Sequence, residues 1–282
     1  MAHGIVTGFD GSAQSEAAVG WAAAEAALRG VPLRIVHAWP WLGAALDDGP
    51  AAAPHRGALH ESAEVAERLR EAHPGLEVVT EALAADPVDA LLAAAPEHRL
   101  VVLGSRGLGG FAGLLVGSVG LAVAARSTTP VVLVRDTAPA PAGSPEIVVG
   151  VADESSAAVL EFACAEAERR GARVRAVHGW ELIPFWTAAG WMPPQADSAL
   201  READVRAALE KAVAPARAAH PGVDLVTETR IGGAAHALVG AAAHADLVVV
   251  GRREHRPAPR LGPVAHAAVH HCTAPVVVVP HA

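Results

Sequence analysis

The chain has 282 residues, of which 52% are hydrophobic, and a net charge of −8 at neutral pH, a length that suits one large or two ordinary domains. The acidic balance and the lack of tyrosine argue against non-specific nucleic-acid binding and against an aromatic platform for stacking bases. No apolar run approaches the roughly 18 residues of a membrane span, and the N-terminus lacks the pattern of a signal peptide, so we expect a cytoplasmic protein that binds neither nucleic acid nor membrane.

Strand and helix patterns alternate along the first half. Strands such as LVVLG (100–104) are continuously apolar, as expected when both faces of a sheet are covered. This pattern predicts a Rossmann-like or flavodoxin-like α/β domain with a doubly wound, five-stranded parallel sheet. The expected strands cover 4–9, 33–39, 76–83, 100–104 and 131–134, and the expected helices cover 14–29, 57–72, 86–95 and 115–126.

The second half repeats the first. AHPGLEVVTE (72–81) recurs as AHPGVDLVTE (219–228), and LVVLG (100–104) recurs as LVVVG (247–251). The opening strand and helix and the closing strand recur in the same order, which indicates a duplicated domain. The stretch 135–145 is rich in Pro, Ala and Gly and reads as the connection. We therefore place domain 1 at 1–136, a linker at 137–145 and domain 2 at 146–282.

Long stretches interrupt this pattern after the second strand of each half, at 40–57 and 181–198. The second carries Trp186, Trp191 and Met192. A lid or an interface is one interpretation, and a loop that covers its own core is the other.

Ligands of doubly wound sheets bind beyond the carboxyl ends of the strands, at the switch point of strand order. Asp10, Ala38 and Gly104 lie at these ends. Gly104 also opens a glycine-rich stretch, GSRGLGGFAGLLVGS. The stretch lacks the lysine of a Walker A motif, and its match to G-x-G-x-x-G/A follows the wrong strand for a dinucleotide fold.

A third phosphate-binding pattern, G-x2-G-x9-G-S/T, fits without adjustment. Its residues are Gly104, Ser105, Arg106, Gly107, Gly117 and Ser118. Glycine at 104 would let a nucleotide approach the main chain, and Gly107 would form an anion-binding nest of N–H groups. Gly117 and Ser118 open a helix whose free N–H groups favour phosphate.

With the opening GFDGS, the strand IVHAW and the closing TPVVLV, this pattern resembles the nucleotide-binding motif of the universal stress protein family, here as a tandem pair. The resemblance implies ATP, with or without magnesium, as the ligand. It places Asp10 and Ala38 at the adenine and ribose end, and Gly8, Leu103 and Val119 along the pocket. It also implies that the terminal strands pair, either within one chain or between two chains of a homodimer.

The corresponding loop of the second half, GRREHRPAPRLGP (251–263), departs from the pattern. Glu254 stands at the middle glycine position, Pro263 stands in place of the serine, and the loop is two residues shorter. Ala152 aligns with Asp10. We therefore expect domain 2 to have lost tight nucleotide binding, although its arginines leave anion binding by side chains open.

Weaker patterns compete with this interpretation. The glycine stretch alone is compatible with a helix cap and a flexible loop. His266, His270 and Cys272 suggest a metal site, but no fourth ligand is evident and we predict none. His37 and His178 either touch nucleotide or satisfy backbone groups, and the second is favoured.

The sequence thus predicts an ATP-binding protein with a regulatory role in stress response. No catalytic base or triad is evident, so we expect no enzyme. A slow ATPase is the alternative, and a flavin protein of similar topology is a third reading that the missing loop aromatics disfavour.

Overall fold

The computed structural model describes residues 4–39, 53–105, 117–135, 145–181, 185–187, 190–192, 198–254 and 260–282. The chain forms two compact units. The first comprises 1–138 with the short segments 254–261 and 275–280, and the second comprises 139–253, 262–274 and 281–282. Within the described residues, no helix combines the length and the apolar character needed to cross a membrane.

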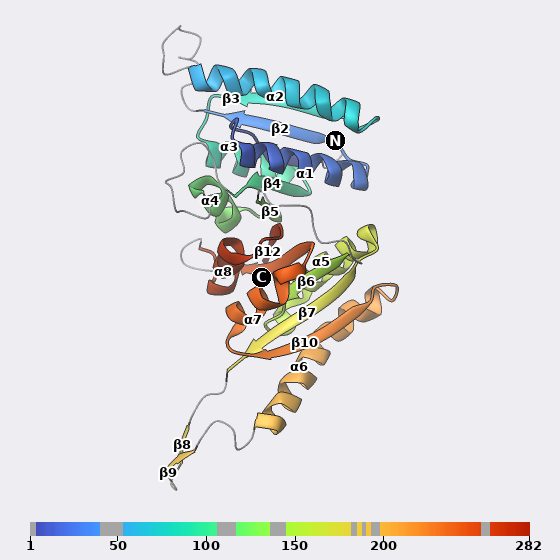
Figure 1. Ribbon diagram of the computed structural model, residues 1–282, viewed down its shortest axis with the longest axis vertical. Helices are drawn as coiled ribbons and strands as arrows, with labels where there is room; N and C mark the ends of the chain where they lie inside the picture. Colours follow the sequence, from blue (N-terminus) through green and yellow to red (C-terminus); the bar gives the residue numbers. More distant parts are fainter. Residues whose placement is uncertain are drawn as a thin grey trace. The chain divides into compact units, whose positions relative to one another are not determined.

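The first unit alternates strands and helices along its sequence (Figure 1). Parallel pairing gives the strand order β3–β2–β1–β4–β5. The elements are β1 (Ile5–Gly8), α1 (Ala13–Arg29), β2 (Leu33–Ala38), α2 (Ala53–Ala72), β3 (Val78–Leu83), α3 (Pro87–Ala94), the 3-10 turn η3 (Ala95–Glu97), β4 (Leu100–Gly104), α4 (Ser118–Arg126) and β5 (Val131–Val134).

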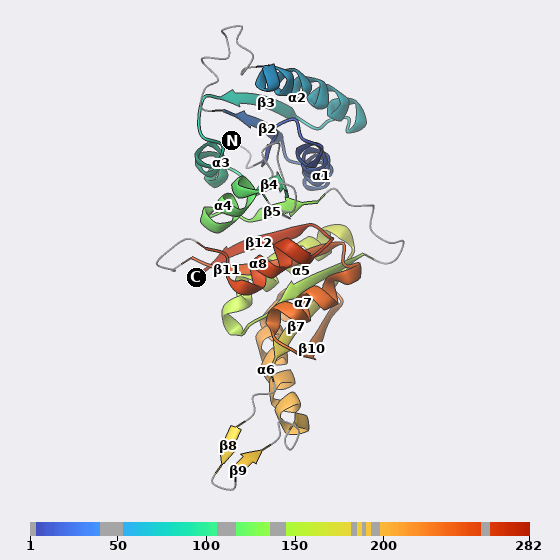
Figure 2. The ribbon, with the colours of Figure 1, turned by 60° about the vertical axis from the view of Figure 1, so that its left-hand side comes forward.

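Helices cover both faces of this sheet. Figure 2 shows α1 and α2 on one face and α3 and α4 on the other. The chain leaves β1 toward β2 on one side and later returns to β4 on the other, so the switch point lies between β1 and β4. The inner strands β1, β4 and β5 are buried on both faces, with Ile5, Val101 and Val132 at 0% exposure, whereas the outer strand β3 is largely exposed. The predicted doubly wound α/β fold is confirmed.

The second unit repeats the pairing of the first four strands of this sheet. Its parallel strands pair in the order β10–β7–β6–β11. The elements from residue 146 onward are β6 (Glu146–Gly150), the 3-10 turn η4 (Glu154–Ser156), α5 (Ala157–Arg170), β7 (Arg173–Trp180), β8 (Phe185–Thr187), β9 (Gly190–Met192), α6 (Ser198–Ala219), β10 (Leu225–Ile231), α7 (Ala234–Ala241), the 3-10 turn η5 (Ala242–His244), β11 (Leu247–Arg253), α8 (Pro263–His271) and β12 (Val276–His281).

Matching helix ends show why the two sequences fold alike. The glycines that follow α1 and α5, Gly30 and Gly171, adopt the left-handed conformation with φ of 62° and 61°. Glycine reaches this conformation without steric cost and so ends each helix cleanly. The next residues then enter β2 and β7. The same local device therefore sets the second strand of each sheet.

One element was not predicted. The stretch 181–198, expected as a lid, an interface or a covering loop, contains a two-stranded antiparallel hairpin of β8 and β9. Trp186 lies opposite Trp191 in its register. The short apolar runs FWT and GWM resemble loop residues in sequence, because three residues carry too little alternation to indicate a strand. The matching first-half stretch, 40–52, lies outside the described residues.

Candidate nucleotide site at the carboxyl edge of the first sheet

The predicted site residues lie at the carboxyl ends of β1, β2 and β4. Gly8 ends β1 and lies against Leu103, since a Cβ added to Gly8 would be 2.9 Å from Leu103 Cδ2. Ala38 ends β2, the neighbour of β1 on its other side. Gly104 ends β4, and Ser105 directly follows it. The sheet therefore brings Gly8, Ala38, Leu103, Gly104 and Ser105 to one edge.

Asp10 follows β1 at this edge and is held by a short network of its own loop. Its Oδ1 accepts a hydrogen bond from Ser12 N–H at 3.0 Å. Its own N–H donates to Ser15 Oγ at 3.3 Å, and that hydroxyl donates to Ser12 O at 2.8 Å. Ser15 is 5% exposed and was not predicted as a site residue. The recurrence of serine at 156 in the second half is the signal that could have found it.

The two ends of the glycine-rich loop meet at one point. Gly117 N–H donates to Ser105 O at 2.6 Å, and Ser105 N–H donates to Val134 O at 2.7 Å. These bonds tie the start of α4 to the ends of β4 and β5. Arg106 and Gly107, predicted as phosphate ligands, lie outside the described residues. These hydrogen bonds thus hold the two ends of the loop together next to Gly104 and at Gly117, the first and third glycines of the motif.

Helix α4 begins at this anchor, and no side chain among the described residues caps its N-terminal donors. Gly117 is its N-cap and supplies no side-chain hydrogen bond, and the first turn contains no acidic residue. The first backbone bond of the helix runs from Leu121 N–H to Gly117 O. The N–H groups of Ser118, Val119 and Gly120 precede that bond and so point out of the helix end. Ser118 is exposed, and Val119 is partly exposed.

Gly104 lies directly against helix α1. A Cβ at this position would lie 2.6 Å from Gln14 O and 3.0 Å from Ser15 N, both backbone atoms of α1. Glycine is needed here because strand β4 passes directly against that helix. The close neighbour of Gly104 in the structure is the protein's own main chain, and its contact with a nucleotide stays a prediction.

His37 and His178 satisfy backbone carbonyls, as favoured from the sequence. His37 Nδ1 lies 2.9 Å from Phe9 O, and His178 Nδ1 lies 2.8 Å from Val151 O. These two carbonyls occupy matching positions after β1 and β6. Each histidine therefore fastens the end of one central strand to its neighbour.

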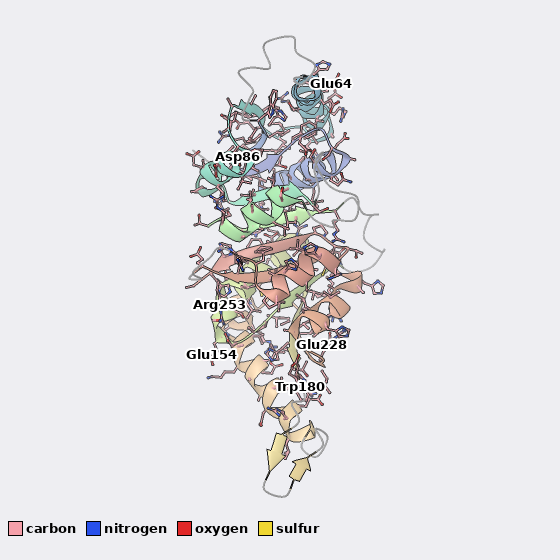
Figure 3. The ribbon with its side chains drawn as sticks, turned by 90° about the vertical axis from the view of Figure 1, so that its left-hand side faces the viewer. Glu64, Asp86, Glu154, Trp180, Glu228 and Arg253 are labelled. Atoms are coloured by element: carbon pink, nitrogen blue, oxygen red, sulfur yellow. The ribbon has the colours of Figure 1, made fainter. Side chains whose placement is uncertain are left out.

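The corresponding edge of the second unit carries exposed charged and polar side chains that contact one another. Ala152 N–H donates to Ser156 Oγ at 3.0 Å, which makes Ala152 the counterpart of Asp10 in a turn one residue shorter. Arg253 lies 3.6 Å from Asp153 Oδ2 and 3.4 Å from Ser155 Oγ. Figure 3 labels Arg253 and Glu154 on the same side of this unit.

The charges at this edge stabilise one another. Hydrogen bonding from Ser155, aided by the charges of Arg253 and His281, lowers the pKa of Asp153. At the start of α8, Pro263 occupies the first helical position and has no N–H to offer. The donors that α4 presents in the first unit are therefore reduced here.

Other features lie away from the predicted site. A cavity of about 460 Å³ lies in the second unit, at the ends of β7 and β10, and its lining includes Trp180, Arg230 and His236. The rings of His266 and His270 have centroids 4.3 Å apart. Among the described residues, no group of three or more His, Cys, Asp or Glu side chains is arranged to hold a metal ion.

Comparisons with known proteins agree with this architecture. The Universal stress protein family profile matches residues 1–135 and again 145–280. A universal stress protein of Mycobacterium tuberculosis is 31% identical over 297 residues, which covers 98% of this chain and 96% of that protein. One from Mycolicibacterium smegmatis is 30% identical and covers 98% of this chain and 97% of that protein.

A solved structure shows the same fold over the whole length. The universal stress protein from Archaeoglobus fulgidus has a TM-score of 0.71 and 18% identity, and the match covers 99% of this chain and 96% of that one. The profile matches in both halves and the full-length relatives show that this chain belongs to the universal stress protein family.

Proposed function

We propose that the first half of the chain binds ATP at the carboxyl edge of β1, β2 and β4, and that this binding serves a regulatory role in stress response. The observation that carries the proposal is the uncapped start of α4 beside the switch point. Membership of the family and the G-x2-G-x9-G-S spacing support it.

The other helices of the first unit show why this helix end matters. Ser12 caps α1 by accepting from Ser15 N–H, and Asp86 caps α3 by accepting from Val88 N–H. Of the three helices of this unit whose N-caps are described, only α4 has no side-chain cap. Its free N–H groups and the positive end of its dipole favour a phosphate group.

The residues at the edge also fit the rest of a nucleotide. Asp10 is a carboxylate held in place by Ser12 and offers an acceptor for hydroxyl or amino groups. Gly8 and Ala38 leave the strand ends uncrowded by large side chains. In this proposal the bound nucleotide spans from Asp10 at its base and sugar end to Ser118 at its phosphate end. Magnesium, where present, would accompany the phosphates.

We further propose one nucleotide per chain. The matching place in the second unit holds the Arg253–Asp153 ion pair, and Pro263 removes one helix donor. A lost charge-assisted hydrogen bond costs about 1.5–3 kcal/mol. Two such losses amount to roughly 3–6 kcal/mol, on the order of a hundred- to ten-thousand-fold in affinity. The second half would then serve a structural or partner-binding role.

Calorimetric titration of the full chain with ATP tests the proposal. We expect one site, and we expect Gly117→Glu to abolish it because a carboxylate would occupy the phosphate position. Gly262→Glu is the matched control, since Gly262 is the N-cap of α8, and this variant should bind like the parent. Binding by Gly117→Glu at the parental affinity would show that the site is misplaced.

Two further measurements separate the alternatives. Mass spectrometry of ligand released from the denatured protein identifies ATP, ADP or AMP. Release of phosphate from ATP with magnesium would favour a slow ATPase over a binding protein. Two equally tight sites per chain would contradict the assignment of a single competent half.

A further inference from the structure

A histidine in the second unit lies between two glutamates. His220 directly follows α6 and is 8% exposed. Its Nε2 hydrogen-bonds Glu161 Oε2 at 3.0 Å, and its Nδ1 lies 2.8 Å from Glu168 Oε1 in a close ion-pair contact. Glu161 and Glu168 are seven residues apart on α5, a spacing that places them on one face of the helix. The imidazole therefore bridges two turns of α5.

The chemistry of imidazole makes this bridge depend on a proton. A neutral ring carries one N–H, so its other nitrogen has only a lone pair and cannot donate a hydrogen bond to the carboxylate that it faces. The cation carries two N–H groups and can donate to both carboxylates. The carboxylates of Glu168 and Glu161 accordingly raise the pKa of His220, against the burial that would lower it.

Other ionisable groups near the bridge do not compete in the neutral range. Cys164 lies on α5 between the two glutamates, and burial, with their negative charge, raises the pKa of its thiol to about 11. Arg217, in the last turn of α6, pairs with Glu210 and Leu225 O. Asp224, before β10, is exposed. The charges that act on the ring are therefore the two glutamates.

The first half lacks this bridge. His73 occupies the position of His220 in the repeated AHPG turn. Glu25 and Arg29 in α1 have the same spacing as Glu166 and Arg170 in α5, and this match aligns the two helices. In this alignment, Gly20 corresponds to Glu161 and Ala27 corresponds to Glu168. No carboxylate stands at those positions of α1. The duplicated chain thus contains its own control.

We propose that protonated His220 links the turn after α6 to α5 by binding both glutamates, and that this link makes the second unit sensitive to pH near neutrality. The sign follows from the direction of the shift. The folded-state pKa of His220 lies above the ordinary value of 6.5. The link therefore contributes fully to the free energy of unfolding below pH 6.5, and this contribution is lost as pH rises through the folded-state value. For each pKa unit by which the folded-state value exceeds the unfolded-state value, the folded state binds the proton ten times more tightly than the unfolded state.

Proton NMR of the full chain tests the titration directly. The Cε1–H resonance that disappears in His220→Gln identifies the residue. We expect it to titrate above pH 6.5 in the parent and to return toward that value in Glu161→Gln/Glu168→Gln. Both glutamates are about half exposed or more, so this double variant keeps the test available if His220→Gln fails to fold.

Hydrogen exchange between pH 6 and pH 8.5, corrected for intrinsic rates, tests the structural effect. Protection of 157–170 should fall with rising pH in the parent and in the matched control His73→Gln, and it should lose this dependence in His220→Gln. A His220 resonance that titrates at or below 6.5, or a parental pH dependence in His220→Gln, would overturn the proposal.

Discussion

At Gly104, a single methyl group would collide with main chain. The nearest atoms to an added Cβ are Gln14 O and Gln14 C of α1, at 2.6 and 2.7 Å. At the matching Gly251, the nearest atom is His281 Nε2 at 2.6 Å, the far end of a flexible side chain. A side chain can rotate away, whereas the first turn of a capped helix cannot move without disturbing its strand contacts.

We therefore expect Gly104→Ala to destabilise the first unit by about 1–3 kcal/mol, as overpacking does in closely packed interiors. Gly251→Ala is the matched variant and should cost less, because the imidazole can move. Urea titrations followed by circular dichroism give the two free energies of unfolding, and hydrogen exchange shows which unit opens first. A larger cost for Gly251→Ala would contradict this argument.

Each unit has its own ion pair between neighbouring strands, at matching positions in the two halves. Arg34 of β2 bonds Glu81 of β3, with Nε 2.7 Å from Oε2. The matching Arg175 of β7 lies 3.2 Å from Glu228 of β10, and it also forks onto both oxygens of Glu146 of β6 at 2.8 Å. The second unit therefore links three strands where the first links two. Glu228 is labelled in Figure 3.

Arg175→Met should cost the second unit about 1.5–3 kcal/mol, because it removes charge-assisted bonds from Glu146, which is 9% exposed. Arg34→Met should cost the first unit less than about 1 kcal/mol, since that pair is more exposed. Protection of β7 and β2 in hydrogen exchange measures each effect. Equal losses in the two units would argue against a role for the third strand.

The same network has a defined acid limit. Burial opposes ionisation of Glu228, but bonds from Arg230 and Arg175 outweigh it and hold its pKa below the ordinary value. Its contribution is therefore present above about pH 4.5 and is lost as pH falls through the folded-state value. This window lies well below the one set by His220, so the two effects separate on the pH axis.

For the molecule as a whole, we predict that the closing strands of the two halves pair, within one chain or between two chains. Each is apolar, and an unprotected apolar edge strand invites pairing. Cysteine at Leu133 combined with cysteine at Val276, Val277 or Val278 should give a crosslink under oxidising conditions. Non-reducing gels show whether it lies within or between chains, and light scattering gives the mass.

A matched negative control uses the other edge of the first sheet. Cysteine at Val79 of β3, combined with the same three positions, should not crosslink. If none of the Leu133 combinations forms a disulfide, the closing strands do not pair and the prediction is wrong. The native Cys164 and Cys272 are both buried and should not form disulfides in this experiment.

Much of the fold could be predicted because duplication and buried strands leave strong signals. The strand 100–104 and the strand 131–134 have the predicted bounds. The β8–β9 hairpin could not be predicted, since its strands are only three residues long. At the candidate site, the pattern singled out Gly104 and Gly117 but could not show that Gly104 passes directly against α1, nor that Ser15 orients the Asp10 turn. Such contacts depend on the distance between elements, which no local pattern encodes.

The bond from Gly117 N–H to Ser105 O brings the two ends of the glycine-rich stretch together. Its two attachment points belong to a strand and a helix that the rest of the unit holds in place. Lengthening such a stretch costs little, about 0.6 kcal/mol for each doubling. The second half already carries a version two residues shorter between Gly251 and Gly262. We therefore expect that exchanging the stretch between these two points alters the ligand preference of the proposed site, while the sheet that supports it stays as it is.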